Sequence, residues 1–187
     1  MAIKHIVIIN GSGGVGKDTF VDLVDNYISA YPVSSVEKIK TIAQSLGWDG
    51  GKTEKDRKFL SDLKILSGEY NDLPFNEIIN NIKLFLEPGK KDIVFLMIRE
   101  PVEIQRVKDY IEKDLNATCV TLLITNSNVK SISSNMADNG VSNYYYDYTI
   151  RNDGTLEDLD KDALYFSKWI SANDPGIVVN NHRRCLS

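Results

Sequence analysis

The sequence contains little cysteine and no long apolar run. Its two cysteines, Cys119 and Cys185, lie far apart among 187 residues and form no metal-ligand spacing, which argues against a disulfide scaffold and against a cysteine-ligated metal. The apolar run at 6–9 is too short to cross a membrane and leads directly into glycines, so we interpret it as a strand and not as a signal peptide. We expect a cytoplasmic protein without a membrane partner, in which Cys119 is a buried free thiol.

Basic residues are not in excess either. The chain has 22 Lys and Arg against 26 Asp and Glu, a net charge of −4, whereas binding to a nucleic-acid polymer requires clustered cations. A small nucleotide needs only a few local cations and is compatible with this balance. The apolar fraction of 42% is ordinary for a globular protein, and 187 residues suffice for a single domain, 1–187, with one sizeable core.

Apolar runs of the strand type alternate with apolar residues at helical spacing. Continuous runs, typical of strands buried on both faces of a parallel sheet, occur at 6–9, 92–98 and 117–125, and shorter extended pieces are expected near residue 32 and at 147–151. Helices are expected at 17–28, in the later part of 32–48, and at 57–72, 75–87, 102–114 and 155–170. This order predicts a three-layer α/β fold, with a mostly parallel five-stranded sheet and helices on both faces.

Three segments stand apart from this alternation. Residues 37–87 carry two extra helices and form a candidate helical subdomain. Residues 126–146 are polar, rich in Asn and Ser and aperiodic, and a loop of this length inside a compact domain is usually functional, for example as a lid. Residues 171–187 form a C-terminal tail outside the main pattern. Thr155 and Asp158 are spaced as a capping box that starts the last helix.

Residues 11–19 read GSGGVGKDT and lie between the first strand and the first helix. Glycines let the chain turn several N–H groups into one concavity, and the helix N-terminus behind them favours an anion. Lys17 adds a cation that reaches the phosphates of a nucleotide. A glycine-rich turn without a binding role needs fewer glycines and no such lysine. We predict that nucleotide phosphates bind to this loop: Gly11, Gly13, Gly14, Val15, Gly16, Lys17, Asp18 and Thr19.

The loop departs from the usual phosphate-binding pattern after Lys17. That pattern places Ser or Thr next, and its hydroxyl ligates Mg²⁺, whereas here Asp18 follows and the hydroxyl comes one residue later, at Thr19. A carboxylate is a hard oxygen ligand, so Asp18 and Thr19 are the candidate metal ligands. A carboxylate near a helix start also suits a capping role, and the sequence leaves both roles of Asp18 open.

Two motifs of other phosphate-binding proteins are missing. No Asn-Lys-x-Asp stretch is present, which argues against a GTPase. The buried strand at 92–98 runs into Arg99 and Glu100, where a mechanical ATPase carries an aspartate. Ligands of open α/β sheets bind beyond the carboxyl ends of the strands, so Arg99 is a candidate for binding a phosphorylated acceptor. The alternative for Arg99 is an ion pair with Glu100 or Glu103.

The loop GSGGVGKDTF resembles that of phage-type deoxynucleoside monophosphate kinases and of phosphomevalonate kinase, which also carry Gly-Lys-Asp. The stretches LGWDGGKTEKDRKFLSDLK and YYYDYTIRNDGTLEDL look like a group of phage and bacterial deoxynucleotide monophosphate kinases, also described as adenylate-kinase-like, and the similarity runs in patches from residue 6 to about 170. The resemblance implies ATP and Mg²⁺ at the loop, an acceptor-binding subdomain at 37–87 and a lid at 126–146. The implied activity is that of a phosphotransferase, which moves the γ-phosphoryl group of ATP to a (deoxy)nucleoside monophosphate.

Phosphoryl transfer requires cations around the phosphates. Arg57 is a candidate for the acceptor phosphate, because Arg57 and Lys64 share one face of a predicted helix; a solvated arginine is the alternative. We expect Arg106 at the surface, and the resemblance places Arg151 near the adenine base. The candidate catalytic residues are Lys17, Arg99 and Arg57.

The expected lid contains no arginine, and Lys130 is its only cation. Related kinases usually place arginines there, so two alternatives stay open: a nucleotide-binding protein without kinase activity, and a kinase of another phosphorylated metabolite such as a coenzyme precursor. A homodimer is also left open. Aromatic residues that could stack on a base, although clustered aromatics more often serve packing, are Trp48, Tyr144, Tyr145, Tyr146 and Tyr148.

Overall fold

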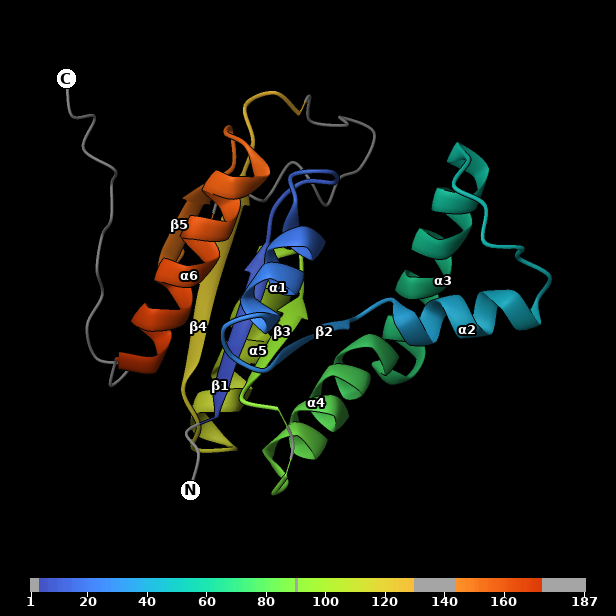
Figure 1. Ribbon diagram of the computed structural model, residues 1–187. Helices are drawn as coiled ribbons and strands as arrows, with labels where there is room; N and C mark the ends of the chain where they lie inside the picture. The colour runs from blue at the N-terminus through green and yellow to red at the C-terminus, as the bar shows by residue number, and fades with distance from the viewer. Residues whose placement is uncertain (1–3, 90, 130–143, 173–187) are drawn as a thin grey trace.

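The computed structural model describes residues 4–89, 91–129 and 144–172, which form a sheet with helices on both faces (Figure 1). Five strands lie in the order β2-β3-β1-β4-β5, and all neighbouring pairs are parallel. The strands are β1 (His5–Asn10), β2 (Ala30–Ser34), β3 (Ile93–Met97), β4 (Cys119–Thr125) and β5 (Tyr148–Arg151). The helices are α1 (Lys17–Asp25), α2 (Glu37–Ser45), α3 (Glu54–Asn71), α4 (Leu73–Leu86), α5 (Pro101–Lys113) and α6 (Leu156–Ala172). The three-layer α/β fold expected from the sequence is confirmed.

The central strand β1 is buried on both faces, as its continuous apolar run requires. Ile8 of β1 is aligned with Leu96 of β3 on one side and with Thr121 of β4 on the other. Strand β2 lies at the edge of the sheet, a place that tolerates Pro32 because proline has no N–H to donate. Since all strands are parallel, their carboxyl ends meet at one edge, where the glycine loop follows β1.

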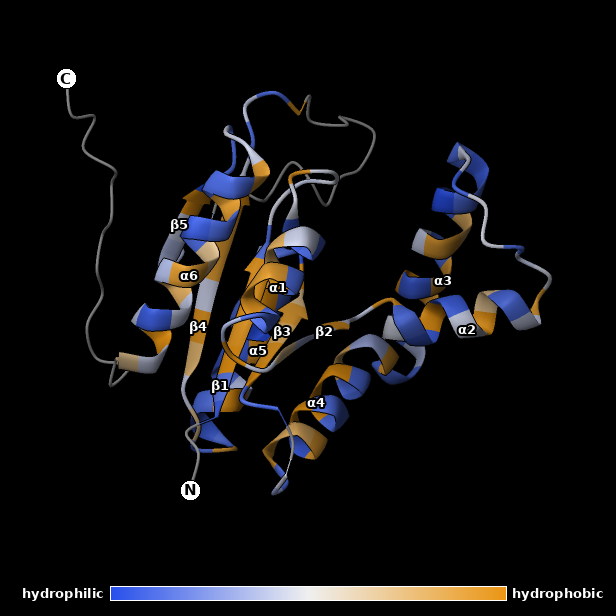
Figure 2. Cartoon of the chain, in the orientation of Figure 1, coloured by the Kyte–Doolittle hydropathy of each residue, from blue (hydrophilic) through white to orange (hydrophobic). Residues whose placement is uncertain are grey.

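Helices cover the two faces of the sheet with separate apolar cores (Figure 2). On one face α1 and α6 bury Phe20 and Phe166 against Phe95 of β3, and the Phe20 and Phe166 rings meet edge to face with centroids 5.6 Å apart. On the other face α4 and α5 bury Ile82 and Ile111. The sheet edge that carries the glycine loop is therefore supported from both sides.

Helices α2 and α3 stand off from the sheet (Figure 1). A capping box starts α3: Thr53 N–H donates to Asp56 Oδ2 at 2.9 Å, and Asp56 N–H donates to Thr53 Oγ1 at 3.2 Å. The helix therefore begins at Glu54, earlier than the expected residue 57. The apolar stripe expected along it is not a core stripe, because α3 packs on α2 and α4 instead of the sheet; no residue of α3 is buried, and Leu66 is 64% exposed.

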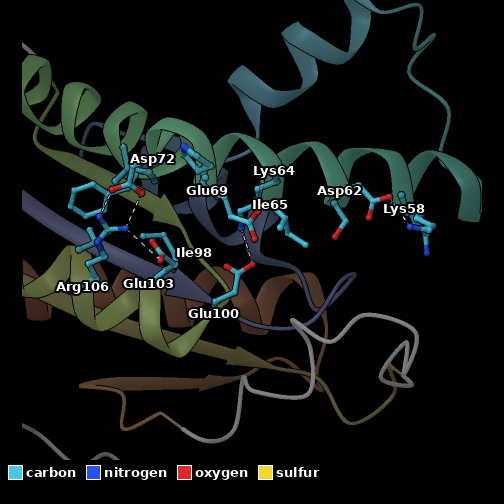
Figure 3. Close-up of a pocket in the computed structure, with 18 of the residues that line it drawn as sticks. Lys58, Asp62, Lys64, Ile65, Glu69, Asp72, Ile98, Glu100, Glu103 and Arg106 are labelled. Carbon is cyan, nitrogen blue, oxygen red and sulfur yellow. Dashed lines mark hydrogen bonds and ion pairs between the residues drawn. The ribbon is translucent and has the colours of Figure 1, made fainter.

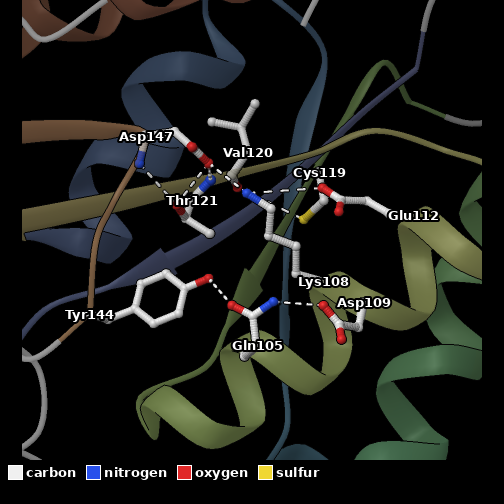
Figure 4. Close-up of polar contacts among 9 residues, drawn as sticks. All are labelled: Gln105, Lys108, Asp109, Glu112, Cys119, Val120, Thr121, Tyr144 and Asp147. Carbon is white, nitrogen blue, oxygen red and sulfur yellow. Dashed lines mark hydrogen bonds and ion pairs between the residues drawn. The ribbon is translucent and has the colours of Figure 1, made fainter. Parts of the chain in front are cut away.

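A polar network fastens the start of β5 to β4 and α5 (Figure 4). Asp147 accepts hydrogen bonds from the N–H and the hydroxyl of Thr121, both at 2.8 Å, and pairs with Lys108 at 3.1 Å. Burial alone would lower the pKa of Lys108, but the nearby acidic groups, Asp147 first among them, together outweigh burial and hold the pKa above its ordinary value. Cys119 is a buried free thiol, as expected, and burial raises its pKa far above the usual range.

The last helix, α6, begins where the sequence predicts. The expected capping box starts α6: Thr155 N–H donates to Asp158 Oδ2 at 3.0 Å, and Asp158 N–H donates to Thr155 Oγ1 at 3.2 Å. Most of the expected lid, 130–143 with Lys130, and most of the tail, 173–187 with Cys185, lie outside the described residues. Among the helices that are described, none combines the length and apolarity needed to cross a bilayer.

Candidate functional site

The loop between β1 and α1 turns through three glycines in the left-handed region. Gly11, Gly14 and Gly16 have φ angles of 143°, 83° and 98°, which side chains rarely allow. Space is equally restrictive, because a Cβ on Gly11 would lie 2.3 Å from the carbonyl oxygen of Ile124 in β4. Gly16 caps α1, and the first N–H groups of a helix have no partner inside it. The loop therefore presents free amides and the positive end of a helix dipole, the combination that binds anions.

Lys17 adds a full positive charge to the same place. Its ammonium Nζ donates to the main-chain oxygens of Gly11 at 2.5 Å and Ser12 at 2.8 Å. These two bonds fold the side chain back over the start of the loop instead of toward solvent. The loop thus concentrates an ammonium group and helix-terminal amides, which suits the several negative charges of a nucleotide's phosphates.

Asn10, the last residue of β1, is a buried hub that the sequence interpretation missed. Its Oδ1 accepts the N–H of Gly11 at 2.7 Å, and its Nδ2 donates to the main-chain oxygen of Arg99 at 3.0 Å and to Tyr146 Oη at 2.6 Å. The side chain therefore joins the start of the loop to the end of β3 and to the segment before β5. The signal available in the sequence was a polar residue that closes an otherwise apolar buried strand.

Asp18 and Thr19 are both exposed on the first turn of α1. Gly16 occupies the cap position, and no side chain closes it in the described structure, so the capping role that the sequence left open for Asp18 gains no support. Their carboxylate and hydroxyl oxygens are of the kind that Mg²⁺ prefers. Within the described ranges no cluster of three His, Cys, Asp or Glu could hold a metal ion.

A cleft of about 1580 Å³ opens at the carboxyl edge of the sheet, between α3 on one side and α5 on the other (Figure 3). Its floor includes Ser35 after β2 and Glu100 after β3. Strand β3 pairs directly with β1, so this floor lies next to the strand that leads into the glycine loop. Six basic residues line the cleft: Lys52, Lys55, Arg57, Lys58, Lys64 and Arg106.

One ion pair crosses the cleft from α3 to the end of β3 (Figure 3). Lys64 Nζ lies 2.7 Å from Glu100 Oε1, and the two side chains are only 22% and 37% exposed. Burial alone would raise the pKa of Glu100, but Lys64, together with the main-chain N–H groups of Glu100 and Arg99, outweighs burial and holds the pKa below its ordinary value. The second carboxylate oxygen, Oε2, is buried without a hydrogen-bond partner in the described structure. Glu100 is therefore an ionised group with one free acceptor atom at the cleft floor.

A second set of contacts joins the cleft walls at the junction of α3 and α4. Arg106 of α5 bonds both carboxylate oxygens of Asp72, one of them at 2.9 Å, and its guanidinium lies 3.9 Å from the centre of the Phe75 ring. The hydrogen bond to Asp72 raises the pKa of Arg106. Arg106 was expected at the surface, and its side chain is indeed 42% exposed; the contacts with Asp72 and Phe75 also hold α5 to the junction of α3 and α4.

The remaining predicted cations occupy different places. Arg57 is exposed and lines the cleft wall. The two carboxylates weighed as partners of Arg99 both have other contacts: Glu100 lies 2.7 Å from Lys64, and Glu103 lies 3.8 Å from Arg106. Arg151 pairs with Asp153 directly after β5.

The aromatic residues mostly serve packing. Tyr148 lies against the rings of Phe166 and Trp169, and Tyr146 is buried beside Tyr144, with ring centroids 5.1 Å apart. The indole N–H of Trp48 donates to the main-chain oxygen of Gly51, at 3.2 Å. Tyr145 is exposed. The packing alternative therefore accounts for Tyr146 and Tyr148, and Trp48 closes a local turn.

Replacing Glu100 by glutamine is expected to lower the thermal midpoint at neutral pH and to matter less in acid. A carboxylate whose folded-state pKa is depressed contributes stability above its ordinary value of 4.5 and loses it as the pH falls through the folded-state value. Thermal unfolding of both proteins from pH 7 down to about pH 3.5 should show the two curves converging. Glu69→Gln, in the same cleft, is the control, and a difference independent of pH would exclude the ion-pair contribution.

No protein-family model matches the chain, and no curated protein does. Solved structures match it over most of its length at low identity. A putative kinase from Chloroflexus aurantiacus has a TM-score of 0.55, is 12% identical and covers 92% of this chain and 98% of its own. The Mycobacterium tuberculosis APS kinase CysC in complex with AMPPNP and APS has a TM-score of 0.51, with 14% identity and coverage of 88% and 98%. A gluconokinase from Sinorhizobium meliloti has a TM-score of 0.50, is 9% identical and covers 92% of this chain and 95% of its own. With its sheet order and its glycine loop after β1, the chain has the three-layer fold of the P-loop kinases.

Proposed function

We propose that the protein is an ATP-dependent kinase of a small molecule, which transfers the γ-phosphoryl group of ATP to an acceptor bound in the cleft between α3 and α5. The observation that carries the proposal is that the phosphate-binding loop and this cleft open at the same edge of the sheet, on the adjacent strands β1 and β3. Donor and acceptor would therefore be held side by side, which is the main contribution of a protein to phosphoryl transfer. The kinases with the same fold support this assignment.

In this function the chain's own residues position and neutralise phosphates. Lys17 and the amides around Gly13 to Thr19 hold the donor phosphates, and Arg99 neutralises charge at the end of β3. Asp18 and Thr19 would hold Mg²⁺, directly or through water. The ion would supply positive charge beside the loop, against the negative charge that develops on the phosphates during transfer.

The acceptor that we favour is a (deoxy)nucleoside monophosphate. Three cations that line the cleft, Lys52, Lys55 and Arg57, are exposed and form no salt bridge within 4 Å in the described structure. Lys58 and Lys64, in contrast, are paired with Asp62 and Glu100. The first three cations suit a phosphate that is brought in by the acceptor. A phosphate acceptor attacks as an anion and needs no general base, so cations around its phosphate are sufficient for transfer.

A second acceptor class is favoured by a different observation, the buried free oxygen of Glu100. If the acceptor is a hydroxyl, its oxygen forms a bond to the γ-phosphorus, the bond to the β-phosphate bridging oxygen breaks, and the hydroxyl proton goes to a carboxylate. Glu100 is ionised at the cleft floor and is placed for that role. Its depressed pKa makes it a weak base, which is why the monophosphate remains the first candidate.

A panel of acceptors with Mg·ATP tests the proposal. The full chain is incubated with deoxynucleoside and ribonucleoside monophosphates and, separately, with alcohols that carry no phosphate, and ADP and the phosphorylated product are quantified. ADP formation above the blank with a monophosphate supports the first acceptor class, and formation with an alcohol supports the second. Nucleotide binding without transfer to any acceptor would contradict the proposed activity and support the alternative of a nucleotide-binding protein.

Replacing Arg57 by alanine is expected to raise the KM for the acceptor by about tenfold or more, because a charge-assisted bond to its phosphate is lost. The KM for ATP should not change, since Arg57 lies on the cleft wall and not on the loop. Steady-state kinetics with each substrate varied in turn measures the two effects. Lys58→Ala is the matched control, because Lys58 is adjacent but bonds Asp62 at 2.6 Å; equal shifts in both variants would contradict the role of Arg57.

A further inference from the structure

A hydrogen bond from Asn152 connects the phosphate-binding loop to the outer strand β5. The loop motif itself gives Asn152 no role. Asn152 directly follows β5, and its side-chain Nδ2 donates to the main-chain oxygen of Val15 at 2.9 Å. Its own N–H donates to the oxygen of Thr125 at the end of β4, at 2.7 Å. The main chain of Asn152 is therefore held by β4, and its side chain extends to Val15 in the loop.

Peptide geometry gives this contact a consequence for ligand binding. Val15 and Gly16 share one peptide group, and in a trans peptide the carbonyl oxygen and the N–H point in opposite directions. A bond that fixes the Val15 oxygen toward Asn152 therefore fixes the Gly16 N–H in the opposite direction. That N–H precedes the first turn of α1 and belongs to the group of amides that a helix leaves without an internal partner.

The neighbouring glycine is adapted to the same contact. A Cβ on Gly16 would lie 2.5 Å from Asn152 Nδ2, and Gly16 has a φ of 98°. The absence of a side chain at this position thus allows the amide of Asn152 to approach the loop. Sequence spacing offers no hint of the pair, because the two bonded residues are 137 positions apart.

We propose that Asn152 is a positioning residue of the phosphate-binding loop, which orients the Val15–Gly16 peptide so that its N–H faces the donor phosphates. Only a side chain with a hydrogen-bond donor can do this, because its partner is a carbonyl oxygen. An aspartate of the same shape would bring a carboxylate oxygen against that carbonyl and turn the contact into a repulsion. The proposal rests on the proposed function for the identity of the ligand, the phosphates of a nucleotide.

The test compares Asn152→Asp and Asn152→Ala with the wild-type chain. Isothermal titration with ADP should give binding about tenfold weaker in both variants, as expected for the loss of one oriented hydrogen bond, with the aspartate variant the weaker of the two. In steady state the KM for ATP should rise while the KM for the acceptor stays constant. A general loss of structure would change both constants and would lower the thermal midpoint of the free protein.

Asn81→Ala is the matched control, because Asn81 also donates from its side-chain amide to a main-chain oxygen, that of Glu77 at 2.7 Å, but on α4. It should bind ADP as the wild type does. ADP binding by both Asn152 variants at wild-type strength would overturn the positioning role. If the wild type binds ADP and the variants bind it more weakly, but no acceptor is phosphorylated, the kinase proposal fails while the role of Asn152 stands.

Discussion

Replacing Lys17 by alanine is expected to abolish phosphoryl transfer and to leave the fold intact. Removing one charge that stabilises the transition state typically lowers kcat by about 10²–10³-fold, and Lys17 is the only cation in the loop itself. Its ammonium donates to the main-chain oxygens of Gly11 and Ser12 in the loop, and its half-buried side chain is not part of either apolar core. The decisive measurement is kcat/KM for ATP together with the thermal midpoint of the free protein.

Lys161→Ala is the control for the Lys17 variant. Lys161 lies on α6 and pairs with Glu157 at 3.3 Å, on an exposed surface where such pairs contribute little. Its removal also takes away one positive charge, so it corrects for the change in net charge. If Lys17→Ala retains most of the activity of the Lys161→Ala protein, then the loop does not hold the donor phosphates in the way proposed.

The frame of the site could be predicted from the sequence because it depends on local patterns. A continuous apolar run at 6–9, four glycines and a lysine at the start of a helical stripe are all contained in residues 6–28, and each indicates its structure without knowledge of the rest of the chain. The same holds for the capping box of Thr155 and Asp158. Local spacing determined strand, loop and helix here, and the parallel order of the strands followed from the alternation.

The polar contacts that complete the site depend on residues far apart in the chain. Asn10 meets Tyr146 across 136 positions, and Lys64 meets Glu100 across 36. Neither pair has a spacing that a helix or strand would impose, so only the assembled sheet edge brings them together. Helix α3 shows the same limit: the spacing of its apolar residues predicted a helix correctly, but it could not tell whether that helix packs on the sheet, and Leu66 is 64% exposed.

The ion pair between Lys64 and Glu100 also changes which cations of the cleft are available to a phosphate. The sequence made Arg57 the candidate for the acceptor phosphate, whereas the cation that bonds Glu100 at the cleft floor is Lys64. A lysine in such a pair is less available to an incoming phosphate than an unpaired one, because the phosphate must compete with Glu100 for the same ammonium. This competition is a physical reason to assign the acceptor phosphate to Arg57 before Lys64.

Replacing Gly11 by alanine is expected to destabilise the protein by about 2–5 kcal/mol, the sum of about 1–2 kcal/mol for an unfavourable φ and about 1–3 kcal/mol for overpacking. The added Cβ would meet the main-chain oxygen of Ile124 at 2.3 Å, and a strand in the middle of the sheet cannot move aside as a flexible side chain can. Denaturant unfolding of the free protein measures this loss. A midpoint equal to that of the wild type would show that the loop does not approach β4 as closely as described.

Gly13→Ala is the matched control within the same loop. A Cβ at Gly13 would have no neighbour within 4 Å, and its φ is not in the left-handed region, so the free energy of unfolding should change by less than about 0.5 kcal/mol or rise slightly. The two variants add the same methyl group only two residues apart. Their difference therefore isolates the contact with β4 from any general effect of stiffening the loop, and it separates the glycine that the fold requires from one whose added methyl would face open space beside the proposed phosphate site.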